Sequence, residues 1–248
     1  MSDSAVELPG PPKNSPRAFP LLELPLELRL RIYEYLFYFP GRTLDLDPTN
    51  YRIIAPRLHY FLVNQQIHDE AAKAFFSGNT IRLFPTFGKF FNTKKPLLAR
   101  LSPRYRSFVS EIELRLGPGW GAPPRCQNTD KSLGLEDCTS LQRLKVFIEL
   151  DPSADFLYGF RGKGMTKDSY KVFSIELLRG IIEQVPSLHT IEIDAFPGVA
   201  KDAPMVLAIV AEVERAGKRL AWGPLRGWHQ QEDPGQVGLE MDMASMSL

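Results

Sequence analysis

Residues 141–148 read Leu141-Gln142-Arg143-Leu144-Lys145-Val146-Phe147-Ile148, with apolar side chains at the first, fourth, sixth and eighth positions. This alternation is typical of a β-strand that buries one of its two faces. The same spacing begins again at Val109 and at Leu188. The apolar members of these two further runs are Val109, Ile112, Leu114, Leu116, Leu188, Ile191 and Ile193. We therefore predict three short strands in the second half of the chain.

Helical patterns lie between and after these strands. Residues 171–184 carry apolar side chains at four-residue steps, beginning at Phe173, and can pack on the strands through that face. Further helices are expected at 204–217 and, in a short form, at 132–137. Strands that alternate with helices indicate parallel pairing, with one helix in each crossover.

The L-x-x-L-x-L spacing of the three runs is also the strand signature of leucine-rich repeats. The runs start 32 and 47 residues apart, so the repeat is irregular. We predict a mixed α/β fold in which residues 107–222 form an irregular leucine-rich-repeat-like βα array with parallel strands. Glu192 and Asp194 alternate with the apolar residues of the third run, and we expect them on the exposed sheet face, where a partner could dock.

Residues 19–106 have a different, mostly helical texture. Pro25 suits the first turn of a helix that runs to about residue 38, where Pro40 and Gly41 end it. A second helix is predicted from 57 to 76. A short strand at 80–84 and small helical pieces over 86–101 complete this helical module.

The first helix has two apolar faces rather than one. On a helical wheel, one face holds Leu28, Ile32, Tyr35 and Leu36, and the other holds Leu26, Leu30, Tyr33 and Phe37. Only Arg29 interrupts this apolar surface. One face can pack on the second helix, while the other needs a cover, either the C-terminal part of this chain or another protein. The wheel alone leaves both possibilities open.

Two motifs in this module carry a family resemblance. Residues 19–33 read Phe-Pro-Leu-Leu-Glu-Leu-Pro-Leu-Glu-Leu-Arg-Leu-Arg-Ile-Tyr, and residues 62–71 read Leu-Val-Asn-Gln-Gln-Ile-His-Asp-Glu-Ala. Together with Phe75-Phe76 and Asn79-Thr80, they resemble the F-box-like domains of filamentous ascomycete fungi. The family's usual patterns are L-P-x-E-L-R-x-x-I-Y, then V-N-R-Q-I-H-x-E-A and F-Y-x-x-N-T. Gln65 departs from the pattern, since Arg is common there.

This resemblance implies an F-box-like helical module at 19–106 that presents its helices to a Skp-family adaptor of a cullin ubiquitin ligase. Carried over position by position, the adaptor-binding residues are Leu24, Pro25, Leu28, Ile32 and Leu36. The βα array would then recognise a protein substrate. We expect a substrate-recruiting adaptor that works by docking, has no catalytic residue and needs no cofactor. The alternative is a structural F-box-like protein with no ligase role.

A basic stretch supports a different alternative. No Asp or Glu occurs between Ala71 and Ser110, and aromatic residues are interleaved with the basic residues of 82–106. The candidate anion-binding residues are Lys89, Lys94, Lys95, Arg100, Arg104 and Arg106. Basic and aromatic residues in one stretch can bind a nucleic-acid backbone and stack bases. A solvated helical face with buried aromatics explains the same pattern and is favoured.

The sequence shows no clear motif of an enzyme active site or of a metal site. The two ends of the chain differ in composition from the residues between them. Four scattered histidines and two cysteines form no ligand pattern, so we predict no metal site. Residues 1–18 are Pro-rich and expected to be disordered, and 223–248 to form a flexible acidic tail. No signal peptide or membrane span is evident, so a cytoplasmic or nuclear location is expected.

Overall fold

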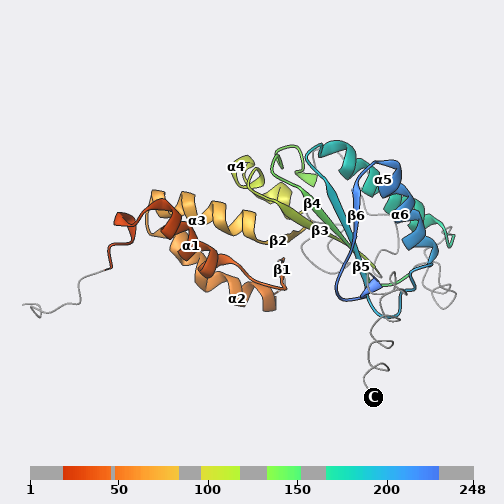
Figure 1. Ribbon diagram of the computed structural model, residues 1–248, viewed down its shortest axis with the longest axis horizontal. Helices are drawn as coiled ribbons and strands as arrows, with labels where there is room; N and C mark the ends of the chain where they lie inside the picture. The colour runs from red at the N-terminus through yellow and green to blue at the C-terminus, as the bar shows by residue number, and fades with distance from the viewer. Residues whose placement is uncertain (1–18, 46–47, 84–95, 118–132, 152–165, 229–248) are drawn as a thin grey trace, which may run out of the picture.

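The computed structural model of the protein describes residues 19–45, 48–83, 96–117, 133–151 and 166–228. Within these ranges the chain forms a six-stranded, all-parallel sheet whose strands follow one another in chain order (Figure 1). The strands are β1 (Thr43–Leu44), β2 (Thr80–Arg82), β3 (Glu111–Leu116), β4 (Arg143–Ile148), β5 (Thr190–Ala195) and β6 (Arg219–Trp222). The prediction of a mixed α/β fold with parallel strands is confirmed.

The repeated spacing of the three predicted strands is matched by their register. Ile112 of β3 pairs with Leu144 of β4, and Leu144 pairs with Ile191 of β5. This apolar row continues outward to Leu44, Ile81 and Leu220 in the remaining strands. The leading residues of the three runs, Val109, Leu141 and Leu188, are fully buried just before their strands. Equivalent positions of the runs therefore stack on one another across the sheet.

Two helices cover the apolar side of this sheet, α5 (Ser169–Gln184) and α6 (Pro204–Arg215). They lie side by side (Figure 1), and both begin and end close to the predicted residues. The apolar side chains at four-residue steps along α5, beginning at Phe173, are buried in the core, as their spacing predicted. The α6 helix starts at Pro204 and ends at Arg215, two residues before Gly217, which has a φ of 62°.

The N-terminal helices gather on the β1 and β2 side of the sheet, away from α5 and α6 (Figure 1). They are α1 (Leu26–Phe37), α2 (Pro48–Leu58) and α3 (Gln65–Gly78), with short 3-10 turns η1 (Leu21–Glu23) and η2 (His59–Leu62). The predicted first helix is confirmed. The sheet includes β1 and β2, which belong to the same part of the chain as these helices.

The single helix predicted over 57–76 is wrong. The chain is helical to residue 58, turns through η2, and restarts at Gln65. Asn64 causes the break, because it adopts an extended backbone with φ −160° and its side-chain oxygen accepts a hydrogen bond from Ile67 N at 2.8 Å. That geometry is an N-cap, which begins a new helix.

The smaller helical pieces also differ in part from the sequence expectation. Those expected over 86–101 fall largely outside the described residues, and η3 (Leu98–Arg100) is the part that is seen. A further short helix, α4 (Pro103–Arg106), follows it. Residues 134–137 form a loop and a turn rather than the expected helix, and Leu135 is buried there.

Residues 223–228, which were expected to begin a flexible tail, are packed against the sheet. Residues 219–222 form β6, and the chain then turns so that Trp228 becomes 1% exposed. Trp228 packs edge-on against Trp222, with ring centroids 5.3 Å apart. Residues 223–228 therefore cover the last strand of the sheet, while 229–248, like 1–18, lie outside the described residues.

Candidate interaction surfaces

The second apolar face of α1 is open to solvent among the described residues. Leu28 is 52% exposed and Tyr35 is 87% exposed. Of the other predicted adaptor-binding positions, Pro25 is exposed, while Leu24, Ile32 and Leu36 are half-buried. Described residues therefore cover this face only in part, since Leu36 packs against the core, whereas Leu28 and Tyr35 stay open to solvent. We call Leu24, Pro25, Leu28, Ile32 and Leu36 the α1 face.

Large exposed apolar side chains concentrate in the helical module. Ten of the fourteen such residues among the described ranges fall between 19 and 63. They include Tyr60, Leu62 and Val63 on the turn that leads into α3. A groove of about 500 Å³ lies between this turn, η1 and α1, and Leu36 contributes to its wall. The exposed apolar side chains are therefore concentrated in one module rather than scattered singly over the surface.

Arg29, the residue that interrupts the apolar wheel, anchors α1 to α3. Its Nε and Nη2 donate to the two carboxylate oxygens of Glu70 on α3, at 2.9 and 2.7 Å. Another guanidinium nitrogen, Nη1, donates to the carbonyl of Leu24, which ties η1 to the same anchor. The hydrogen bonds from Arg29 lower the pKa of Glu70 below its usual range. The sequence alone did not reveal this pairing.

The polar face of the sheet carries charges that alternate in sign from strand to strand. In order from β2 to β5 they are Arg82, then Glu111 and Glu113, then Arg143 and Lys145, then Glu192. Arg143 pairs with Glu111 at 3.3 Å and with Glu192 at 3.2 Å, while Lys145 lies 2.6 Å from Glu111. Cross-strand pairs of opposite charge each stabilise a sheet by about 0.2–1 kcal/mol. They also favour this register over a shifted one.

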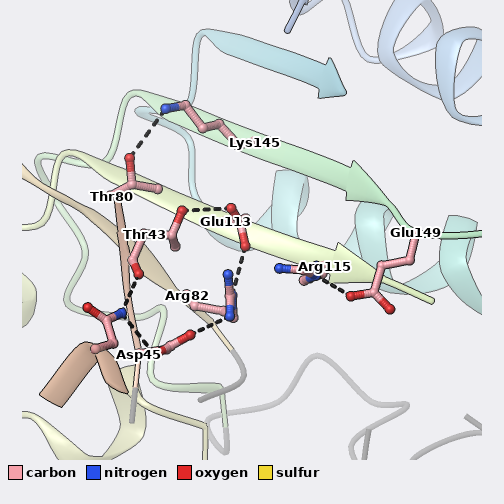
Figure 2. A network of polar contacts seen from close by, with 9 residues as sticks. Thr43, Asp45, Thr80, Arg82, Glu113, Arg115, Lys145 and Glu149 are labelled. Atoms are coloured by element: carbon pink, nitrogen blue, oxygen red, sulfur yellow. Dashed lines mark hydrogen bonds and ion pairs between the residues drawn. The ribbon is translucent and has the colours of Figure 1, made fainter. Parts of the chain in front are cut away.

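A more deeply buried part of the same network joins β1 to β3 (Figure 2). Arg82 lies between two carboxylates, Asp45 and Glu113, and its Nε donates to Glu113 at 2.7 Å. The Thr43 hydroxyl donates to the other oxygen of Glu113 at 2.7 Å. Asn50 of α2 donates to both Thr43 O and Asp45. These bonds fasten the helical module to the sheet.

A groove of about 520 Å³ lies on this polar face and reaches from the β1 side to the turn after β6. We call it the sheet groove. Its walls include Arg42 and Thr43 at one end, Lys145 and Phe147 in the middle, and Leu225 at the other end. Glu192, which was expected on the exposed sheet face, lines the groove on the polar face of the sheet but is half-buried there.

Asp194 also borders the sheet groove, but its carboxylate binds the backbone of the turn after β6. Its carboxylate accepts hydrogen bonds from Leu225 N at 3.0 Å and from Arg226 N at 2.8 Å. These bonds hold the turn that follows β6. Asp194 is therefore engaged with this chain's own backbone rather than free for a partner.

The predicted anion-binding residues are not brought together as a free basic surface among the described residues. Lys89, Lys94 and Lys95 lie outside those residues, and Arg100 is exposed. Arg104 pairs with Asp69 at 2.7 Å, and Arg106 pairs with Asp137 at 3.1 Å. These pairs neutralise two of the cations on which the nucleic-acid alternative depends.

Neither metal-binding groups nor a membrane span is found in the part of the chain that the structure describes. No three His, Cys, Asp or Glu side chains there come together as a metal site. His68 instead bridges Phe61 O at 2.9 Å and the Tyr105 hydroxyl at 2.6 Å, which is a packing role. None of the described helices has the length and apolar character needed to cross a membrane.

Comparison of the chain with protein-family models, with curated proteins and with solved structures gives no match. The resemblance to F-box-like domains therefore depends on the motif residues themselves.

Proposed function

We propose that this protein is an F-box-like, substrate-recruiting adaptor, in which the α1 face binds a Skp-family adaptor of a cullin ubiquitin ligase. The observation that carries the proposal is the exposure of apolar side chains on the second face of α1. Of the motif positions that the resemblance assigns to adaptor binding, Pro25 and Leu28 are exposed, and Leu24, Ile32 and Leu36 are half-buried. An apolar patch of this kind on a soluble module is typical of a protein–protein contact.

The anchoring of α1 supports the same role. The Arg29–Glu70 pair ties α1 to α3, and the buried side chains of Tyr33 and Phe37 pack the helix into the core. The exposed side chains of α1 are therefore held in one position. A preformed face loses little conformational freedom when a partner binds.

The sheet groove is the proposed docking surface for the recruited protein. It lies on the polar side of the sheet, opposite α5 and α6, and its wall extends from Arg42 to Leu225. Because β1 and β2 join the sheet directly, the groove and the α1 face belong to one connected body. Recruitment by double docking requires no catalytic residue or cofactor, and it would take place in the cytoplasm or nucleus.

Co-purification with a Skp-family adaptor tests the proposal. The full chain should retain the adaptor, and the double variant Leu28→Asp, Ile32→Asp should lose at least about tenfold of it, because two charges would enter a desolvated interface. Leu207→Asp on α6 is the matched control, since Leu207 is 54% exposed and lies outside the α1 face.

Thermal unfolding of all three proteins separates loss of binding from loss of fold. The proposal fails if the native chain does not bind the adaptor. It also fails if the double variant, folded as well as the Leu207 control, binds as tightly as the native chain.

A further inference from the structure

The polar face of the sheet carries more carboxylates than cations. The sheet groove is lined by four acidic side chains and two basic ones, namely Glu111, Glu113, Glu192, Asp194, Arg42 and Lys145. Two further cations, Arg82 and Arg143, lie beside the groove, and each is shared between two carboxylates. The ion pairs of this face therefore leave an excess of negative charge.

The excess is greatest on β5. Glu192 shares Arg143 with Glu111 through its Oε2 atom, at 3.2 Å, and its Oε1 accepts no hydrogen bond from a described residue. Asp194 forms no ion pair within the described ranges, since its carboxylate accepts only backbone N–H groups. Arg42 lies at the β1 end, four strand spacings or roughly 19 Å away. That separation exceeds the Debye length of about 8 Å at physiological salt, so Arg42 offsets little of the charge on β5.

Apolar side chains border these two carboxylates. Phe147 of β4 and Leu225 of the turn after β6 both line the groove, and Leu225 is 58% exposed. Phe196, which is 39% exposed, meets the Phe147 ring edge-on at a centroid distance of 5.0 Å and extends the apolar surface. A carboxylate next to apolar walls suits the side chains of arginine and lysine, which combine an aliphatic stem with a cationic tip.

Space for such a side chain is left on the β6 side of Glu192. Its register neighbour there is Ala221, which carries only a methyl group. The next position of β6 on this face is Gly223, which has no side chain. Arg219, two residues before Ala221, is exposed, forms no ion pair with a described residue and does not line the groove. A cation from another molecule can therefore reach Oε1 of Glu192.

We propose that the β5 end of the sheet groove binds an arginine or lysine side chain on an exposed basic segment of another protein. The cationic tip lies on Oε1 of Glu192, near the charge of Asp194, and the stem packs against Phe147 and Leu225. That this segment belongs to the recruited protein rests on the proposed function, whereas the preference for a cationic side chain does not. The groove thus discriminates against acidic segments, because like charges repel at close range.

Two peptides that differ in charge alone test this preference on the native full chain. One reads Gly-Ser-Arg-Leu-Arg-Ser-Gly and carries fluorescein, and the other has citrulline, a neutral analogue of similar shape, in place of both arginines. Fluorescence anisotropy at physiological salt should show binding of the arginine peptide that is tighter by about fivefold, because only this peptide can form an ion pair. The difference should shrink in about 0.5 M salt, since screening weakens exposed ion pairs.

Two charge variants locate the contact. Glu192→Gln should weaken binding of the arginine peptide by about threefold to fivefold and leave the citrulline peptide unchanged, because the variant loses the charge but keeps the shape of the side chain. Glu183→Gln is the matched control, since it removes the same charge from an exposed position of α5, on the opposite side of the sheet. It should change neither affinity. Thermal unfolding of both variants shows whether they are folded.

Equal affinities of the native chain for the two peptides would overturn the proposal, whether or not the variants fold. Equal losses in Glu192→Gln and Glu183→Gln would also overturn it. The measurement contains no Skp-family adaptor and leaves the α1 face intact, so its failure is distinguishable from failure of the proposed function.

Discussion

Arg29 and Glu70 form a two-point ion pair, although 41 residues separate them in the chain. Arg29 is the arginine of the first of the two motifs that resemble F-box-like domains, and Glu70 is the glutamate of the second. The two motifs are thus joined by a specific contact between α1 and α3. The same arginine reaches the Leu24 carbonyl, so the pair also sets the approach of η1 to the helix.

Removing one partner of this pair should destabilise the helical module. Arg29→Ala leaves the Glu70 carboxylate, whose side chain is 16% exposed, without its main partner. We expect the melting temperature to fall by several degrees, measured by circular dichroism. The variant Arg29→Met with Glu70→Leu should recover much of the loss, because an apolar pair needs no compensation. Additive losses in the double variant would show that the two residues act independently.

Asn79 should be one of the most sensitive polar positions of the fold. It is 2% exposed, its Oδ1 accepts from Phe39 N at 2.9 Å, and its Nδ2 donates to Phe37 O at 2.7 Å and Phe75 O at 2.8 Å. Asn79→Ala leaves these buried backbone groups unpaired and should cost about 2–4 kcal/mol in urea unfolding. Asn64→Ala, which removes only an N-cap, should cost about 1 kcal/mol. Equal costs would contradict this role of Asn79.

Glu212 should give the protein a measurable acid sensitivity. Hydrogen bonds from Arg215 and Arg179 lower the pKa of this 4% exposed carboxyl from 4.5 to about 2. A group with a depressed folded pKa stabilises the fold above its unfolded pKa, and that contribution is lost as the pH falls through the folded value. The stability difference between the native chain and Glu212→Gln should therefore shrink between about pH 5 and pH 2.

The size of this difference above pH 5 should be about 1–2 kcal/mol, since the two arginines are half-exposed and solvent screens them. Glu214→Gln removes the same charge from an exposed neighbour and serves as the control. A difference for Glu212→Gln that stays constant down to pH 2 would contradict the assignment.

Long periodic segments were predictable from the sequence because their periodicity reflects burial of one face. The runs beginning at Val109, Leu141 and Leu188 became β3, β4 and β5 with their equivalent positions in register. Shorter elements could not be read in this way. With two and four residues, β1 and β6 are too short to show a period of two, whereas the strand expected at 80–84 is seen as β2.

Contacts between distant residues were also beyond the sequence. The wheel showed Arg29 only as an interruption, because its partner lies on another helix. Similarly, the pairing of Lys145 with Glu111 depends on the register of β4 against β3, which the pattern of one strand does not give. The α2 helix was missed because Pro48, Asn50 and Pro56 weaken its helical pattern.

Gly223 should be essential for the turn that covers β6. A Cβ atom added there would come within 2.5 Å of Cγ of Asp194, far closer than any normal contact. Asp194 cannot move aside easily, because it accepts hydrogen bonds from Leu225 N and Arg226 N. Gly223 N also donates to Ile193 O at 2.8 Å, which fixes the glycine against β5.

Gly223→Ala should therefore loosen the turn and expose Trp228, which we expect as a red shift of tryptophan emission together with a loss of about 1–3 kcal/mol in stability. Gly198→Ala is the matched control, since a Cβ at Gly198 meets no atom within 4 Å and its backbone is not left-handed. This control should leave both the emission and the unfolding midpoint nearly unchanged. If Gly223→Ala behaves like the control, the turn adjusts to the added methyl group and Asp194 does not hold it rigidly.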